Sequence, residues 1–266
     1  MRTVTIQASL EQSAPSSRTW LKAFGNTVVD LLFPPRCVAC RRLGAWLCPD
    51  CQNKVEAIRP PVCRWCGLPL EEPAPPPSAL LQHALSTCER CREGLHEFDG
   101  LVAYAFHTDP LRQAIHELKY EDLRSLAAPL GRLMAQGWSL LAPRDDDVDV
   151  IVPVPLHPTR QRQRGYNQAA LLARELGAHL QRPVVEDALI RTKATAPQVG
   201  LNAQERQANV RDAFQCVNSS LGGKRVLLVD DVCTTGATLE AASAALRKGG
   251  VSSVWAYTLA HARKLG

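Results

Sequence analysis

The stretch that decides the fold is Val226–Thr238, which reads VLLVDDVCTTGAT. Its aliphatic start predicts a strand over Arg225–Val229 that is buried on both faces. Two adjacent carboxylates, Asp230 and Asp231, follow at the carboxyl end of that strand, and a hydroxyl-rich turn then opens a helix predicted over Thr238–Lys248. Ligands of open α/β sheets bind at the carboxyl ends of the strands. The stretch therefore predicts a ligand site in an α/β domain.

The chemistry of this turn indicates a sugar phosphate. The start of a helix presents unpaired N–H groups and a positive dipole to an anion. Thr234, Thr235 and Thr238 add hydroxyl donors, and Gly236 allows the backbone to approach a phosphate closely. Two carboxylates beside a phosphate would repel it unless they face a polyol or a metal, so they fit ribose hydroxyls and a bound Mg²⁺.

Other readings of the turn explain less of it. A Walker loop needs a Gly-Lys-Ser/Thr run, and a dinucleotide fingerprint needs three glycines; the turn contains neither. An acidic cap on an ordinary helix would account for one aspartate but not for the whole constellation.

Strands and helices alternate on both sides of this stretch. The alternation predicts a parallel sheet with right-handed crossovers and helices on both faces. The further predicted strands are Asp99–Phe106, Val148–Pro155 and Val251–Leu259, and the further predicted helices are Pro110–Tyr120, Leu123–Leu141 and Arg164–Leu180.

Eight of the ten cysteines form four Cys-x-x-Cys pairs: Cys37/Cys40, Cys48/Cys51, Cys63/Cys66 and Cys88/Cys91. Two such pairs complete a tetrahedral four-thiolate site, which suits Zn²⁺, so four pairs predict two structural zinc ions with no open coordination position. An iron–sulfur cluster would also accept thiolates. Sequence order places Cys37, Cys40, Cys48 and Cys51 on one ion and the other four on the second, although an interleaved pairing stays open at this point.

The rest of the chain sets its organisation. The 266 residues carry a net charge of +5, and no apolar run is long enough for a membrane span. The first 19 residues lack the apolar core of a signal peptide and are predicted to be a disordered leader of a cytoplasmic protein. We expect residues 20–95 to form an amphipathic helix (Trp20–Phe33) and a two-zinc module with an extended spacer at Pro69–Pro77. Residues 96–266 would form the α/β domain.

The stretch VLLVDDVCTTGAT resembles the phosphoribosyl-pyrophosphate (PRPP) binding signature of type I phosphoribosyltransferases. The whole chain, from about Leu31, resembles the ComF family, competence-associated phosphoribosyltransferase-like proteins with an N-terminal double zinc ribbon. The matching segments are LLFPPRCVAC (31–40), CRWCGLPL (63–70), LKY (118–120), VPVPLHPTRQRQRGYNQA (152–169) and PQVGLNAQERQANVRDAF (197–214). The resemblance implies a type I phosphoribosyltransferase-like parallel sheet preceded by a small zinc-ribbon module.

The resemblance also implies roles for particular residues. Asp230 and Asp231 would hold the ribose hydroxyls of PRPP, which binds with Mg²⁺. The 5-phosphate would be held by Thr234, Thr235, Gly236, Ala237 and Thr238, and the pyrophosphate by a loop carrying Arg160, Arg162, Arg164 and Asn167. Lys119 and Tyr120 would lie on or near a mobile loop over the site. The implied catalytic set is Asp230, Asp231, Lys119 and Arg164.

Two functions remain open on this basis. One is an enzyme that transfers a phosphoribosyl group to an unidentified acceptor and releases pyrophosphate. The other is a non-catalytic, PRPP-regulated protein of the DNA uptake machinery that binds single-stranded DNA or a partner protein. Thr234 stands where purine-salvage enzymes carry an aspartate, and a threonine cannot act as a general acid or base, which argues against purine salvage. The polar segment Arg191–Phe214 would contact a nucleic acid or a substrate, or bridge the edge of the site.

Overall fold

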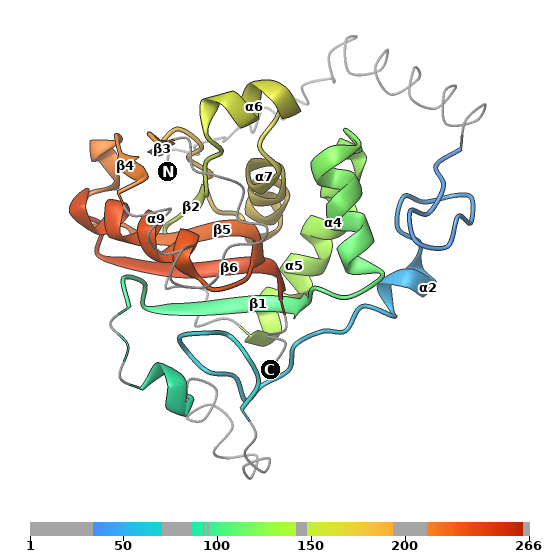
Figure 1. Cartoon of the computed structure of the whole chain (residues 1–266), viewed down its shortest axis with the longest axis horizontal. Coiled ribbons are helices and arrows are strands. Elements are labelled where there is room, and N and C mark those ends of the chain that lie inside the picture. Colours follow the sequence, from blue (N-terminus) through green and yellow to red (C-terminus); the bar gives the residue numbers. More distant parts are fainter. Residues whose placement is uncertain are drawn as a thin grey trace, which may run out of the picture.

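The computed structural model describes residues 34–70, 87–92, 94, 96–141, 148–193 and 212–262. Its centre is a four-stranded parallel sheet in the order β1-β6-β5-β2 (Figure 1). The strands are β1 (Gly100–Phe106), β2 (Val150–Pro153), β5 (Arg225–Cys233) and β6 (Ser253–His261). The expected α/β architecture is confirmed. The leader, the helix predicted over Trp20–Phe33 and most of the spacer lie outside the described residues.

Helices cover both faces of the sheet because its strands are apolar on both sides. Along β5, Val226 and Leu228 belong to one core, and Leu227 and Val229 belong to the other. On the first side lies α9 (Ala237–Lys248), which Figure 1 shows in front of β5 and β6. On the second side lie α4 (Leu111–Tyr120), α5 (Ala127–Leu141, preceded by the short helix η3, Arg124–Leu126) and α7 (Gln168–Leu180).

The structure corrects the bounds predicted for two elements near the site. Strand β5 does not end at Val229 but continues through both aspartates to Cys233, because its backbone stays paired with β6 as far as His261. The helix predicted over Arg164–Leu180 begins later, and its first residue instead ends a separate helix that was not predicted. This separate helix, α6 (Pro158–Arg164), ends at Gly165 with a left-handed φ of 79°, and α7 then starts at Gln168.

Two short strands were not predicted from the sequence. They are β3 (Leu189–Arg191) and β4 (Phe214–Cys216), which pair antiparallel and form a separate two-stranded sheet. They flank the polar segment, of which residues 194–211 lie outside the described part of the chain. Each strand has only three residues, too few for a period-two pattern to stand out.

The cysteine-rich region lies against the outer edge of β1. Its connecting residue Ala57 pairs antiparallel with Ala105, and the N–H of Ile58 donates to the carbonyl of Tyr104 at 2.9 Å. Further along the edge, the N–H of Leu101 donates to the carbonyl of Arg64 at 2.8 Å. The region contains two short helices, α2 (Pro49–Gln52) and η2 (Glu89–Cys91). None of the helices in the described residues is both long and apolar enough to cross a membrane.

Candidate active site

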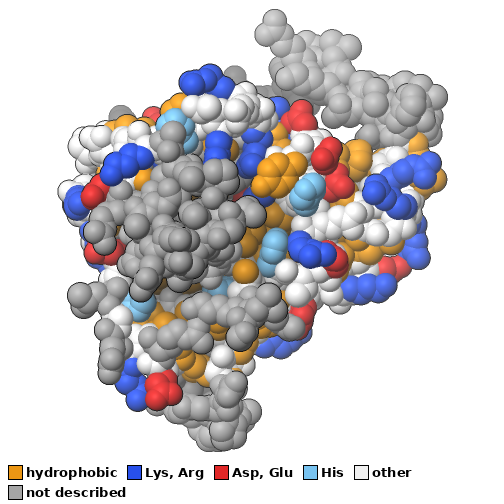
Figure 2. All heavy atoms as spheres, in the orientation of Figure 1, with side chains coloured by type: hydrophobic (Ala, Val, Ile, Leu, Met, Phe, Trp, Pro, Cys, Tyr) orange, Lys and Arg blue, Asp and Glu red, His pale blue; other side chains and the backbone are white. Residues whose placement is uncertain are grey.

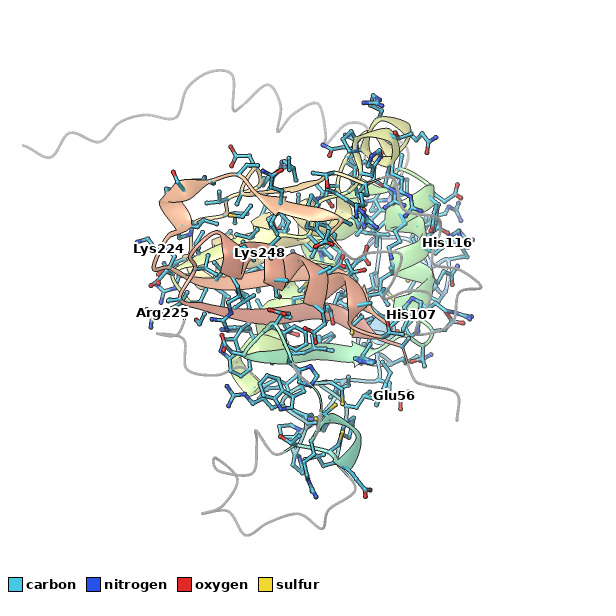
Figure 3. All side chains as sticks on the ribbon, turned by 60° about the vertical axis from the view of Figure 1, so that its left-hand side comes forward. Glu56, His107, His116, Lys224, Arg225 and Lys248 are labelled. Carbon is cyan, nitrogen blue, oxygen red and sulfur yellow. The ribbon has the colours of Figure 1, made fainter. Side chains whose placement is uncertain are left out.

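A pocket of about 980 Å³ opens at the carboxyl ends of the strands. Figure 3 shows the polarity of the sheet: Lys224 and Arg225, at the start of β5, lie at the opposite end of the molecule from His107, which follows β1. The polar and charged residues that line the pocket come from β5, α4, α6 and their neighbours. They are His107, Lys119, Tyr120, Asp122, Arg160, Gln163, Arg164, Tyr166, Gln168, Arg191, Asp230, Asp231, Thr234 and Thr238.

Asp231 is paired with a lysine from another element. Because side chains alternate along a strand, residue 231 points to the same side of the sheet as Leu227 and Val229, where α4 lies. Lys119 Nζ lies 2.7 Å from Asp231 Oδ1, and the two side chains are only 19% and 4% exposed. The second carboxylate oxygen, Oδ2, is buried and has no hydrogen-bond partner among the described residues.

Lys119 and Tyr120 were expected on or near a mobile loop. The structure instead places both residues in the last turn of α4. The end of α4 is fixed to the other wall of the pocket, because the hydroxyl of Tyr166 donates a hydrogen bond to the backbone carbonyl of Leu118. Lys119 therefore reaches Asp231 from a regular helix.

Asp230 lies in a different environment from its neighbour. Burial, followed by the charge of Asp231, raises the pKa of the Asp230 carboxyl to about 7. One carboxylate oxygen, Oδ1, accepts a hydrogen bond from the N–H of Asp231 at 2.8 Å. A bound cation or a set of hydroxyl donors at this position would favour the ionised form and lower this pKa.

The threonine turn connects β5 to α9. Gly236 caps the helix with a left-handed φ of 83°, and a Cβ at this position would meet nothing within 4 Å. Glycine is therefore required by the backbone conformation and not by crowding. Thr234 and Thr238 line the pocket, whereas the hydroxyl of Thr235 accepts a hydrogen bond from the N–H of Ala237 at 3.4 Å.

The predicted arginine loop is the helix α6, and its residues divide between two roles. Arg160 and Arg164 line the pocket; Arg162 is exposed and is not among the described lining residues. Figure 2 shows Lys and Arg side chains over the region where Figure 1 places α6. Arg164 lies over the ring of Tyr120, 5.2 Å from its centroid.

Asn167 is a structural residue between α6 and α7. Its side-chain oxygen caps α7 by accepting from the N–H of Ala169 at 3.0 Å, and its Nδ2 donates to the carbonyl of Val154 at 2.9 Å. Both contacts hold the connection after β2 in place, and Asn167 is not among the described lining residues. Its effect on a ligand would therefore be indirect.

Sequence reasoning missed Arg191 and His107 as pocket residues. Arg191 is 8% exposed at the end of β3, and its guanidinium lies over the ring of Phe214 at 5.3 Å. Burial, with a smaller contribution from Lys119, lowers the pKa of His107. Arg191 begins the polar segment that was expected at the edge of the site, but nothing in the sequence distinguished it from the rest of that segment. Nothing local marks His107, because the order of the strands brings it to the site.

The eight paired cysteines form two clusters in sequence order, so the interleaved pairing is excluded. Within each cluster the four sulfur atoms lie within 4.8 Å of one another; the clusters are Cys37, Cys40, Cys48 and Cys51, then Cys63, Cys66, Cys88 and Cys91. Tetrahedral zinc with its usual bond lengths needs sulfur atoms about 3.8 Å apart. Two of the separations are 3.6 Å, between the sulfurs of Cys40 and Cys48, and 3.9 Å, between those of Cys66 and Cys88.

Backbone donors stabilise thiolates in both clusters. The N–H of Cys48 donates to the sulfur of Cys37 at 3.4 Å, and the N–H of Cys88 donates to that of Cys63 at 3.3 Å. The side chain of Cys66 and these backbone groups lower the pKa of Cys63 to about 4. Four convergent sulfurs, with one thiol of lowered pKa in each cluster (Cys37 and Cys63), fit a structural zinc ion in each cluster.

Comparisons with known proteins agree with both parts of the structure. Residues 28–92 match the double zinc ribbon domain, and residues 162–265 match the phosphoribosyl transferase domain. The fold and the site thus define a phosphoribosyltransferase-type α/β protein with an N-terminal double zinc ribbon. The chain belongs to the ComF family of competence proteins.

The relatives match over most of their length. The chain is 34% identical to competence protein F of Haemophilus influenzae, over 85% of this chain and 97% of that protein. It is 32% identical to the DNA utilization protein YhgH of Escherichia coli K12, over 86% and 98% of the two chains. Among solved structures, a purine phosphoribosyltransferase from Pyrococcus horikoshii is 18% identical with a TM-score of 0.31, over 51% of this chain and 82% of that chain.

Proposed function

We propose that the pocket binds PRPP together with Mg²⁺ and that the protein transfers the phosphoribosyl group to an acceptor, with release of pyrophosphate. The observation that carries the proposal is that Asp230, Asp231 and the threonine turn follow one another along the lining of the pocket. Two carboxylates suit ribose hydroxyls, and the turn at the start of α9 suits a phosphate. A ribose 5-phosphate carries both of these groups, its hydroxyls and its phosphate.

The carboxylates, the threonine turn and the arginines of the pocket each have a place in this proposal. The N–H groups and hydroxyls from Thr234 to Thr238 bind the 5-phosphate, and Asp230 and Asp231 accept hydrogen bonds from the ribose. The partnerless oxygen of Asp231 and the carboxyl of Asp230 are the oxygen ligands available to Mg²⁺. Bound magnesium supplies charge neutralisation of the pyrophosphate. Arg160 and Arg164 stabilise the negative charge that develops on the leaving pyrophosphate.

Lys119 has two partners in this proposal. Without a ligand its ammonium group lies 2.7 Å from the buried carboxylate of Asp231 and forms an ion pair with it. A pyrophosphate bound in the pocket would be a second anion for the ammonium group of Lys119. The arginines at the place of the leaving group favour transfer over binding alone, because their charge contributes most when the pyrophosphate separates.

The proposed biological setting is DNA uptake in the cytoplasm. Two kinds of relatives support it through their names, competence protein F and DNA utilization protein YhgH. The acceptor would then be a base or another group that the cell handles during this process. Thr234 in place of a general acid or base makes a purine-salvage acceptor a poor fit.

Calorimetric titration with PRPP and MgCl₂ tests the ligand. We expect the wild-type protein to bind and Asp231→Asn to bind at least about tenfold more weakly, a loss of about 1.4 kcal/mol. Asp109→Asn is the matched control, because Asp109 is exposed and paired with Arg112 away from the pocket lining. An absence of binding to the wild-type protein would overturn the proposal.

Transfer is tested separately by pyrophosphate release. The protein is incubated with PRPP, MgCl₂ and a panel of pyrimidine and purine bases or single-stranded oligonucleotides. We expect release with at least one acceptor and its loss in Arg164→Gln. Binding of PRPP without release from any acceptor would favour the PRPP-regulated binding protein instead.

A further inference from the structure

Helix α9 starts at the phosphate turn and is bound at both ends by the segment 96–99, which joins the second cysteine cluster to β1. Glu240 lies in the first turn of α9, two residues after the pocket residue Thr238. Its Oε1 lies 2.8 Å from His96 Nδ1, and its Oε2 accepts a hydrogen bond from the N–H of Glu97 at 2.8 Å. Because a carboxylate can only accept, Nδ1 of His96 carries the hydrogen.

The far end of α9 is fixed to the same segment. Arg247 donates to Asp99 Oδ2 at 2.6 Å and to the carbonyl of Ser252 at 2.9 Å. The same oxygen of Asp99 accepts from the N–H of Val254 in β6 at 2.8 Å. The segment 96–99 therefore runs along α9 and contacts both its first and its last turn.

His96 also contacts the second cysteine cluster. Its ring stacks on Trp65 with centroids 4.7 Å apart and an interplanar angle of 14°. Trp65 stands between the cluster residues Cys63 and Cys66, and His96 follows Cys91 by five residues. A continuous line of contacts thus leads from the second cluster through Trp65 and His96 to Glu240 and the phosphate turn.

Because Glu240 is negatively charged, its contact with His96 affects how an anionic ligand binds at the start of α9. A carboxylate in the first turn is favourable for the helix dipole, but it competes with a phosphate at the same helix end. Both oxygens of the carboxylate are bound to His96 and Glu97, and the Glu240 and His96 side chains are 25% and 15% exposed. Loss of the hydrogen bonds from His96 and Glu97 would free the Glu240 carboxylate beside the phosphate turn and destabilise the first turn of α9.

The first cluster has a different surrounding. Its buried residues Cys37, Cys48 and Cys51 belong to the core with α4, α5 and α7, on the opposite side of the sheet from α9. Its linker contacts the edge of β1. The two clusters therefore offer a matched comparison, because each orders a part of the same module but only the second contacts the segment that holds Glu240 within the described residues.

We propose that His96 and Glu240 form a latch through which the second metal cluster positions the phosphate turn. Both are positioning residues, and their effect on PRPP rests on the function proposed above. Metal in the second cluster holds Trp65 and His96 in place; His96 and Glu97 hold Glu240; and Glu240 fixes the first turn of α9.

Hydrogen exchange measured by mass spectrometry tests the latch without any ligand. We compare the zinc-loaded wild-type protein with two variants, Cys91→Ser and Cys51→Ser. Each variant removes one of the four cysteines of a cluster, the last in sequence order. The N–H of Glu240 bonds to the carbonyl of Gly236 at 2.9 Å, so its exchange reports the first turn of α9. We expect at least about tenfold faster exchange in peptides covering 234–241 for Cys91→Ser and little change for Cys51→Ser.

A second set of variants keeps the metal in place. His96→Phe retains a ring against Trp65 but loses the hydrogen bond to Glu240. Arg247→Ala removes the contacts of the far end of α9 with Asp99, Ser252 and the carbonyl of Glu97 but leaves both hydrogen bonds of Glu240 in place. We expect His96→Phe, with both zinc ions bound, to speed exchange at 234–241, and Arg247→Ala to speed it only after residue 243. Glu240→Gln retains an acceptor for the N–H of Glu97 and should restore most of the protection that Glu240→Ala loses.

PRPP titration then measures the consequence. His96→Phe should weaken PRPP binding several-fold and Arg247→Ala should not. Equal exchange at 234–241 in His96→Phe and wild type, or equal effects of Cys91→Ser and Cys51→Ser, would overturn the latch. If the wild-type protein binds no PRPP, the proposed function fails, while the exchange pattern still decides the latch on its own.

Discussion

Asp230 and Asp231 are neighbours in sequence and yet face different surroundings. Alternation along β5 turns Asp231 toward α4, where Lys119 compensates its charge, and turns Asp230 toward the side of α9 and β3. One carboxylate therefore lies beside a cation. The other has a pKa raised to about 7, chiefly by burial.

The raised pKa predicts how stability depends on pH. The unfolded chain releases the Asp230 proton near pH 4, and the folded chain retains it to about pH 7, so stability falls as the pH rises through this window. Asp230→Asn cannot ionise. We expect its free energy of unfolding, relative to wild type, to increase between about pH 5 and about pH 8.

Chemical denaturation at both pH values measures this difference. Asp109→Asn is the control, because Arg112 lowers the pKa of Asp109 and its titration lies below the window. If the difference in the free energy of unfolding between wild type and Asp230→Asn stays constant from about pH 5 to about pH 8, Asp230 titrates as an ordinary aspartate.

The Lys119–Asp231 pair predicts a double-mutant result. Lys119→Met leaves a buried carboxylate without its cation and should cost about 3 kcal/mol. Adding Asp231→Asn removes the stranded charge, so the double variant should be more stable than Lys119→Met alone. Urea unfolding of the two single variants and the double variant gives the coupling energy. Strictly additive losses would contradict a direct pair.

At the scale of elements, α5 and α7 pack closely because one of them carries a glycine at the crossing. A Cβ on Gly131 would stand 2.3 Å from the Cβ of Glu175 in α7. Helix–helix contacts account for this glycine, which intrinsic helix propensity disfavours. The sequence pattern alone predicts the helix but cannot assign the glycine to the crossing.

Gly131→Ala is therefore expected to destabilise the protein in spite of the better helix propensity of alanine. Forcing α5 away from α7 should cost about 1 to 3 kcal/mol. Arg132→Ala, on the exposed face of the same helix, should change stability by less than about 0.5 kcal/mol. Thermal unfolding of both variants makes the comparison, and a gain in stability for Gly131→Ala would show that the crossing is loose.

At the scale of the whole molecule, the cysteine-rich module is a cover for the sheet as well as a metal site. Strand β1 is an edge strand of the four-stranded sheet, and residues around Ala57 and Arg64 occupy its free side. Exposed edges of this kind promote association between chains. The module therefore protects an edge that the α/β domain leaves open.

Removal of zinc should expose this edge. We expect about two zinc ions per chain by metal analysis, and we expect a strong chelator to lower the melting temperature and cause aggregation. Light scattering during chelation and hydrogen exchange of β1 provide the readouts. A metal-free chain that stays monomeric with a protected β1 would contradict this role, and a count well below two would contradict the two-site assignment.

The correct predictions came from patterns that are local in sequence. Short apolar runs predicted the four parallel strands, and the Cys-x-x-Cys pairs predicted two clusters, because each depends on residues a few positions apart. The errors came where tertiary contacts outweigh local preference. Aspartate is a poor strand former, yet pairing with β6 carries β5 through both aspartates to Cys233.

The amino-acid sequence by itself determined the family, the α/β class and the succession of Asp230, Asp231 and the threonine turn. Tertiary structure decided what surrounds them. It brings Lys119 from a helix to Asp231, Arg191 from a short strand into the pocket and His96 to Glu240. Lys119 and His96 each lie more than 100 residues from their partners, so no local pattern in the sequence could have paired them. The order of the strands and the position of the cysteine module bring them together.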